Sequence, residues 1–168
     1  DENIILVAPI VSSTTPANFA SGVAINANIT IVFNQAMDTT AGNEPTVAQT
    51  SAAPTATFTF SAWSTTNVAD DTATFTHGGA NWNELQAVTV QVTGGQNAAA
   101  EVYAEDLPWS FTTEDITAPT VVPTPADGAP AVPTATATYT ITFNEPMQAV
   151  GTFSTDDLTT AGGSWNWD

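Results

Sequence analysis

The sequence predicts an all-β chain made of tandem sandwich modules, and two observations support that prediction. The first is an internal repeat, because the stretch from Ile29 to Asp38 returns as the stretch from Tyr139 to Gln148, at a constant offset of 110 positions. A repeat of this length is one domain long. The second is the placement of the 10 Gly and 11 Pro, most of which stand between short apolar runs. This arrangement is typical of short strands joined by turns.

Both copies of the repeat have the alternation of a strand with one buried face. Large apolar side chains occupy every second position, with Thr or another small residue between them, which is the period of a β-strand. These positions are Ile29, Ile31 and Phe33 in the first copy and Tyr139, Ile141 and Phe143 in the second. We therefore expect a complete module at about residues 1–115 and a partial second module at residues 116–168.

The other strands of the first module are expected at alternating apolar runs, which lie at residues 3–11, 46–48, 55–63, 72–77, 86–93 and 107–113. Pro9 has no amide hydrogen to donate, so the first run is expected to form an edge strand or to change sheets at this proline. A short helix is expected only from Asn97 to Asp106, with Asn97 as its cap. The total of about seven strands is that of an immunoglobulin-like sandwich of about 100 residues.

The same alternation predicts which side chains form the core. Those expected on buried faces are Phe58, Phe60, Val88, Val90, Val92, Leu107, Trp109 and Phe111. Trp109 is flanked at alternate positions by apolar residues, so we expect it to pack inside the module. His77, the single histidine, precedes two glycines and is expected to end a strand.

The charge composition is one-sided, with 17 Asp and Glu, one His, no Lys or Arg, and a formal net charge of −17. Nucleic acid and anionic membrane surfaces are bound through Lys and Arg, so both are excluded as direct partners. Cations are the expected counterpart. The chain has no Cys, which excludes disulfides and thiolate metal sites.

Four short motifs carry a resemblance to a known family. They are Ala8-Pro9-Ile10-Val11, Pro16-Ala17-Asn18, Phe33-Asn34-Gln35-Ala36-Met37 and Trp109-Ser110-Phe111-Thr112-Thr113, and the first three recur from Ala118, Pro125 and Phe143. On these motifs, nearly the whole chain resembles the bacterial Ig-like modules of S-layer proteins and surface adhesins, the Big_5 or SbsA-type Ig-like group. The resemblance implies tandem Ig-like sandwiches on a prokaryotic cell surface. It also implies a non-catalytic role as spacer or assembly unit of an S-layer, filament or adhesin stalk.

The expected partners are neighbouring Ig-like modules or identical chains. The second copy of the repeat has no counterpart of the closing motif that begins at Trp109. Either the natural protein continues past Asp168, or a neighbouring chain supplies the missing strands by β-augmentation.

Calcium is the ion that best suits this chain, because Ca²⁺ takes about six to eight oxygen ligands and many carboxylates here are expected in loops without a basic competitor. The candidate ligands are Glu114 and Asp115 at the module junction, Asp1 and Glu2 before the first module, and Asp38 and Asp127 in loops. No EF-hand or RTX spacing is present. A solvated acidic surface that keeps the protein soluble is the alternative interpretation.

A carbohydrate-binding surface module is the alternative function. Trp82 lies in a Gly- and Asn-rich loop and is the best candidate for an exposed ring that could stack on a surface polysaccharide, although a structural cap is the favoured interpretation. Exposed tryptophans on one surface would favour binding, and buried tryptophans would favour a structural role. An enzyme is not expected, because the sequence lacks the hydrolase, zinc-protease, phosphate-binding and dinucleotide motifs.

Overall fold

The computed structural model describes residues 7–104, 108–124, 126 and 140–146 of the chain. It divides into two compact units, Asp1–Thr117 and Ala118–Asp168, each of which is described by itself. All regular elements of the described residues are strands, and none of those residues forms a helix that could cross a membrane. The strands of the first unit are β1 (Val11–Thr15), β2 (Ile29–Phe33), β3 (Pro45–Gln49), β4 (Ala56–Ser64), β5 (Thr72–Gly79), β6 (Ala87–Gly94) and β7 (Trp109–Thr112). The second unit contains β8 (Val121–Thr124) and β9 (Thr140–Phe143).

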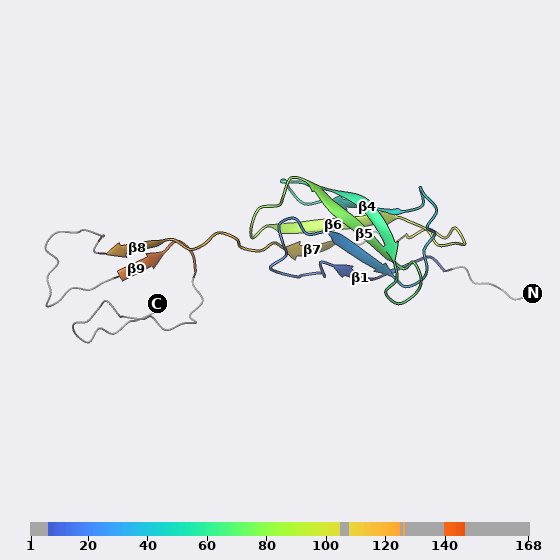
Figure 1. The fold of residues 1–168 in the computed structure, drawn as a ribbon, viewed down its shortest axis with the longest axis horizontal. Coiled ribbons are helices and arrows are strands. Elements are labelled where there is room, and N and C mark those ends of the chain that lie inside the picture. Colours follow the sequence, from blue (N-terminus) through green and yellow to red (C-terminus); the bar gives the residue numbers. More distant parts are fainter. Residues whose placement is uncertain (1–6, 105–107, 125, 127–139, 147–168) are drawn as a thin grey trace, which may run out of the picture. The chain divides into compact units, whose positions relative to one another are not determined.

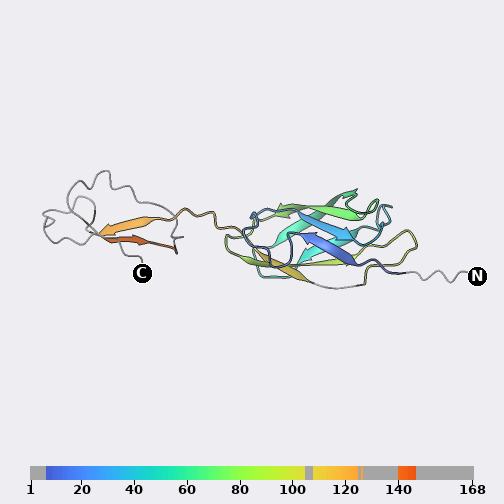
Figure 2. The same ribbon diagram turned by 90° about the horizontal axis from the view of Figure 1, so that it is seen from below.

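The first unit is a sandwich of two antiparallel sheets, which Figures 1 and 2 show from two sides. One sheet has the strand order β1-β2-β5-β4, and the other has the order β3-β6-β7. With the strands lettered A to G along the chain, these orders are ABED and CFG, the topology of a seven-stranded immunoglobulin domain. The predicted fold class is therefore confirmed for this unit.

The core lies between the two sheets, as the alternation of the sequence predicts. Ile29, Ile31 and Phe33 of β2 are fully buried. They face apolar side chains of the opposite sheet, which are also buried and are listed as Val88, Val90, Val92, Trp109 and Phe111. Because successive side chains of a strand point to opposite faces, each of these strands contributes every second residue to the core.

A β-bulge in β4 brings its last aromatic residue onto the core side. The register pairs Phe60 with Phe75 and then Ala62 with Thr74, so one extra residue lies in β4 at this point. Since an inserted residue reverses the alternation, Trp63 lies on the same face as Phe60. The two ring centroids are 5.4 Å apart.

The chain changes sheets at Pro16 and not at Pro9. β1 begins only at Val11 and pairs with β2, and after Pro16 the chain crosses to β7, where Val23 forms a parallel bridge with Thr113. Residues 7–10 form no strand, and residues 3–6 lie outside the described part. The predicted change of sheet at a proline therefore occurs, but at Pro16 and not at Pro9. The alternation of the sequence does not show which proline precedes the change.

The short helix expected from Asn97 to Asp106 is wrong for the described residues of that stretch. The segment is a tight loop in which Oδ1 of Asn97 accepts hydrogen bonds from the amides of Ala99 and Glu101, both at 3.0 Å. Ala100 has a φ of 62°, which is outside the helical region. The asparagine therefore closes a turn instead of starting a helix, as Asn side chains commonly do.

In the second unit, β8 and β9 pair in the same register as β1 and β2 do at their first residue pair. Val121 is opposite Phe143, and Val11 is opposite Phe33. Both members of the pair are therefore displaced by the repeat offset of 110 positions. β1 contains a bulge between Val11 and Ser13 that β8 lacks, so the two pairings differ after this point.

Candidate functional site

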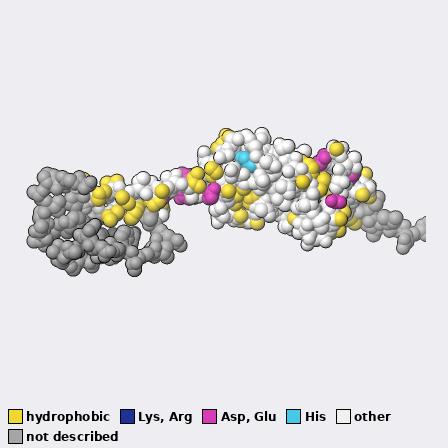
Figure 3. All heavy atoms as spheres, in the orientation of Figure 1, with side chains coloured by type: hydrophobic (Ala, Val, Ile, Leu, Met, Phe, Trp, Pro, Cys, Tyr) yellow, Lys and Arg dark blue, Asp and Glu magenta, His cyan; other side chains and the backbone are white. Residues whose placement is uncertain are grey.

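The described carboxylates all lie outside the strands. None of the nine strands contains Asp or Glu, and every described acidic side chain is in a loop, a turn or the segment after β7. On the face shown in Figure 3, the acidic side chains of the first unit gather near its two ends, and the surface between them shows no acidic side chain. The chemistry of carboxylates is therefore confined to the loops.

Asp71, immediately before β5, is a fully buried carboxylate that organises the β4–β5 turn. Its oxygens accept hydrogen bonds from the amides of Thr66, Asn67 and Val68, each at 2.8 Å, and from the hydroxyl of Thr72 at 2.7 Å. Burial alone would raise the pKa of Asp71, but these hydrogen bonds outweigh it and hold the pKa well below its usual range. Because its oxygens already have these donors, the role of Asp71 is structural.

Asp38, after β2, holds the β2–β3 loop in a similar way. Its carboxylate accepts hydrogen bonds from the amide of Thr40 at 2.9 Å and from the side chains of Asn43 at 2.7 Å and Gln96 at 3.2 Å. The hydroxyl and amide of Thr40, followed by the two side-chain amides, lower the pKa of Asp38 to about 2. The carboxylate is charged at neutral pH and joins two loops.

The segment that leaves the first unit is fastened by a glutamate from the β5–β6 loop. Glu84 accepts hydrogen bonds from the hydroxyl of Thr117 at 2.6 Å and from the amide of Ile116 at 3.1 Å, and these bonds lower its pKa. Glu114 accepts a longer bond from the amide of Ile25, at 3.3 Å. The chain therefore follows a fixed path as far as Thr117.

The calcium ligands predicted from the sequence are only partly within the described residues. Glu114 and Asp115 lie in the segment after β7, and Oδ1 of Asp115 accepts a hydrogen bond from the amide of Thr117 at 3.2 Å. Within the described ranges, no group of three or more His, Cys, Asp or Glu side chains is arranged to hold a metal ion. Three candidates lie outside those ranges, namely Asp1, Glu2 and Asp127. Calcium binding stays a prediction.

Trp82 is buried, as expected of a structural cap, and the exposed position that the carbohydrate alternative requires is wrong. The side chain of Trp82 is only 2% exposed, and its ring packs edge-to-face on Phe111, with centroids 5.2 Å apart. Its Nε1 donates a 2.8 Å hydrogen bond to Oε1 of Gln49. Trp82 closes one end of the core, because its ring finds apolar partners and its N–H finds an acceptor.

His77 belongs to the same aromatic group and does not form a catalytic arrangement. Its ring lies 4.6 Å from that of Trp82 and 5.8 Å from that of Phe58, between centroids, and Nε2 is 3.3 Å from the carbonyl oxygen of Ala80. No serine, threonine or carboxylate side chain is among these neighbours. The predicted position near the end of a strand is confirmed, since His77 precedes the last two residues of β5.

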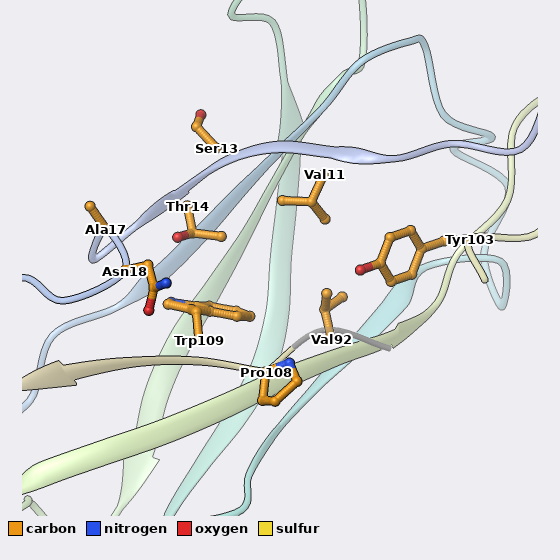
Figure 4. Close-up of a pocket in the computed structure, with 9 residues that line it drawn as sticks. All are labelled: Val11, Ser13, Thr14, Ala17, Asn18, Val92, Tyr103, Pro108 and Trp109. Atoms are coloured by element: carbon orange, nitrogen blue, oxygen red, sulfur yellow. The ribbon is translucent and has the colours of Figure 1, made fainter. Parts of the chain in front are cut away.

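A cavity of about 520 Å³ opens beside β1, the Ala17–Asn18 turn and the start of β7 (Figure 4). Val11, Val92, Tyr103 and Trp109 point toward it and make it largely apolar. Among the described residues that line it, none carries a carboxylate, imidazole or thiol. The hydroxyls of Ser13, Thr14 and Tyr103 therefore have no carboxylate, imidazole or amine among the described lining residues to activate them.

A family model described as the bacterial Ig-like domain, Big_5, matches residues 6–113. The chain belongs to this family. The match covers the whole of the β1–β7 sandwich, so family and fold agree for this Ig-like module. None of the curated proteins compared with the chain matches it.

Membership in the family gives a general function and location for the Ig-like module. Domains of this family occur in bacterial surface proteins and are generally non-catalytic structural modules. The predicted resemblance is confirmed on the motifs that carried it, because they lie within the matched residues of the first copy.

Sequence reasoning missed Gln49, which is a polar centre of the Ig-like module. Its Nε2 donates to the carbonyl oxygens of Ala52 and Pro54, both at 3.0 Å, and its Oε1 accepts from the amide of Ala56 at 2.9 Å and from Trp82. A glutamine at the end of a strand gives no periodic signal. The loop that follows Gln49 contains Pro54, and such a loop leaves backbone carbonyl groups without donors of their own. This was the one sequence feature that could have indicated a side-chain donor nearby.

Proposed function

We propose that the chain is a load-bearing, non-catalytic part of a prokaryotic cell-surface protein, serving as a spacer or assembly unit of an S-layer, filament or adhesin stalk. Membership in the bacterial Ig-like family supports the general role. The pairing between the beginning and the end of the first module carries the proposal of load bearing.

That pairing joins the segment Phe19–Val23 to β7 and the two residues after it. The amide of Phe19 donates to Ser110 at 2.6 Å, and the amide of Val23 donates to Thr112 at 3.2 Å. In the other direction, the amide of Thr112 donates to Ala20 at 2.8 Å, and the amide of Glu114 donates to Val23 at 2.7 Å. The acceptor in each of these bonds is a backbone carbonyl oxygen. The parallel bridge between Val23 and Thr113 shows that the two segments run in the same direction.

The two paired segments lie near the beginning and the end of the module's sequence, and they run parallel to each other. This arrangement resists tension in a particular way. When the two ends of the chain are pulled apart, one segment is drawn along its length past the other, and their hydrogen bonds are loaded together. Each net hydrogen bond contributes only about 1 kcal/mol, so a single bond breaks easily. Breaking several bonds at the same time needs far more force than breaking them one after another. This geometry favours a module that extends little until it unfolds.

The second unit supports a tandem arrangement. β8 and β9 repeat the pairing at the start of the first module. Glu84 fixes the path of the chain as far as Thr117, which lies shortly before β8 in the sequence. We infer that the second unit is the opening of a second Ig-like module, and that calcium at the junction would further stiffen it. The sequence repeat, the resemblance and the oxygen-rich segment Glu114–Asp115 support these inferences.

Single-molecule pulling on the two ends of the chain tests the proposal. We expect one sharp unfolding event that releases roughly 30 nm of chain, since the sandwich from Phe19 onward contains about one hundred residues that extend by about 3.3–3.6 Å each. The variant Val23→Pro removes the amide that donates to Thr112 and should lower the unfolding force markedly.

The control is Val88→Ala, which removes core volume without touching the loaded pairing and is expected to reduce the free energy of unfolding by about 1–3 kcal/mol. If the pairing bears the load, Val23→Pro lowers the force more than Val88→Ala does at equal thermodynamic stability. An equal loss of force in both variants, or smooth extension of the parent chain without a sharp event, would contradict the proposal.

A further inference from the structure

The outer edge of β4 has backbone groups that face away from its sheet. β4 is the last strand in the order β1-β2-β5-β4. Phe58 is opposite His77 of β5, whose amide points the other way and donates to Oδ1 of Asn28 at 2.9 Å. Antiparallel strands alternate between bonded and non-bonded pairs, so the amide and carbonyl of Phe58, and by alternation those of Phe60, face away from β5.

The amide of Ala56, the first residue of β4, also faces away from β5. The amide of Ala56 donates outward to Oε1 of Gln49 and is therefore already paired. The outward carbonyl of Ala56 and the outward groups of Phe58 and Phe60 have no such side-chain partner among the described residues. The free part of the edge thus runs from Ala56 to the bulge that follows Phe60.

The composition of this edge is favourable for pairing with another strand. Residues 56–60 have the sequence Ala-Thr-Phe-Thr-Phe, without charge, Pro or Gly. Natural proteins protect edge strands from unwanted pairing with charged side chains such as Lys, with Pro, or with bulges. On β4 the only such feature is the bulge between Phe60 and Ala62. The bulge limits pairing to the five residues before it, which favours a discrete contact over an extended fibre.

We propose that β4 is a self-association site, at which the β4 edge of a second copy of this chain adds in antiparallel orientation around Phe58. A two-fold axis at Phe58 places the amide of each Phe58 opposite the carbonyl of the other, which is the bonded arrangement that outward-facing groups require. It also places Thr57 opposite Thr59 of the second copy on the outer face, and Ala56 opposite Phe60 on the core side. Hydroxyl meets hydroxyl, and a small side chain meets a large one.

Charge favours a second copy at this edge over other modes of self-association. With a net charge of −17, two chains repel each other wherever acidic loops meet. The β4 edge is free of carboxylates, and the acidic β4–β5 turn that holds Asp70 and Asp71 follows it at one end only. Antiparallel addition carries the two turns to opposite ends of the paired strands. Association should therefore strengthen as salt screens the remaining repulsion.

Sedimentation equilibrium and amide exchange on the whole chain test this proposal. The parent chain should form dimers reversibly, and its dissociation constant should decrease between low salt and about 1 M NaCl. Exchange of the Phe58 amide should slow as protein concentration rises, while the amides of Thr57 and Thr59, which face β5, should not change. The double variant Thr57→Asp and Thr59→Asp sets like charges opposite each other in the dimer and should weaken it by about tenfold or more.

The matched control is Thr46→Asp with Ala48→Asp, which adds the same charge at the same spacing on the exposed face of β3, the edge strand of the other sheet. Thermal melting of both variants shows that each is folded before association is compared. A dimer that weakens only in the β4 variant supports the proposal. A chain that stays monomeric at millimolar concentration, an equal effect in the control, or a Phe58 amide whose exchange ignores concentration would overturn it. The inference does not rest on the load-bearing role.

Discussion

Asn34 and Ile10 exchange two hydrogen bonds, one from the amide of Ile10 to Oδ1 of Asn34 and one from the amide of Asn34 to the carbonyl oxygen of Ile10, both 3.0 Å long. The same exchange joins Thr120 and Asn144, at 2.7 Å and 3.2 Å. Each pair lies where the chain enters its first strand. The side chain of the asparagine thus satisfies the last amide before β1 or β8 and fixes the register of the strand pair.

Replacing Asn34 by Ala should lower the free energy of unfolding of the first module by about 0.5–1.5 kcal/mol, because the amide of Ile10 loses its acceptor. Asn34→Asp keeps an oxygen in the same place and should restore most of the loss. Urea unfolding followed by tryptophan fluorescence measures both. Equal stability of the Ala and Asp variants would show that the acceptor has no role.

Replacing Asp71 by Asn should destabilise the module more strongly. The amide group brings its own hydrogens toward backbone amides that now donate to the carboxylate, and each buried donor left unsatisfied costs about 1–3 kcal/mol. Asp70→Asn is the matched control, since it makes the same chemical change one residue earlier, where no hydrogen bond to the carboxylate is observed among the described residues. Thermal melting should separate the two variants clearly, and similar melting temperatures would argue against the assigned role of Asp71.

Stability should depend on pH in a direction set by Asp38 and Asp71. Both carboxyl groups have a lower pKa in the folded chain than in the unfolded chain, so the folded state binds fewer protons. Their contribution is complete above the ordinary pKa of 3.8 and decreases as the pH falls below about 4; the loss ends near pH 2 for Asp38 and continues to lower pH for Asp71.

Protonation of other carboxylates also relieves repulsion in a chain of this charge, so the useful quantity is the difference in stability between the parent and Asp71→Asn. This difference should be constant from pH 7 to about pH 4 and should shrink at lower pH. Urea midpoints at several pH values measure it. A difference that grows with acidity would have the wrong sign for a depressed pKa.

Added salt should stabilise the chain, and the calcium prediction requires a further effect of Ca²⁺. Sodium chloride screens the repulsion among uncompensated carboxylates and should raise the melting temperature. Calcium bound through Glu114 and Asp115 should raise it more than NaCl of equal ionic strength, and the charge-neutral pair Glu114→Gln and Asp115→Asn should remove the additional rise. Identical curves for the two salts would leave only a solvated acidic surface.

The fold could be predicted from the sequence where large apolar side chains alternate along a strand. Phe33, Val90 and Phe111 lie on the faces that their alternation indicates, because burying every second residue is the physical cause of the pattern. The boundary of β1 could not be predicted in this way. Residues 7–10 are as apolar as a strand, but the hydrogen bonds that begin the strand depend on Asn34, which is distant in sequence.

The polar positions were less accessible to sequence reasoning for a similar reason. A carboxylate in a turn is usually solvated, but Asp71 is buried because the turn folds its own amides around the carboxylate. Trp82 was favoured as a structural cap, but its hydrogen-bond partner Gln49, which belongs to a distant strand, could not be predicted. Loop composition shows that a turn exists, but it does not show which distant side chain completes the turn.

The direction of pulling tests the load-bearing claim most directly. The chain has no Cys, so pairs of cysteine handles can be introduced without interference. Handles at Ala17 and Asp115 lie beyond opposite ends of the paired segments and load their hydrogen bonds together, whereas handles at Ala17 and Pro108 lie at the same end and separate the bonds in turn. If the pairing bears the load, the unfolding force is several times higher for the first pair. Equal forces for the two pairs would contradict the load-bearing claim.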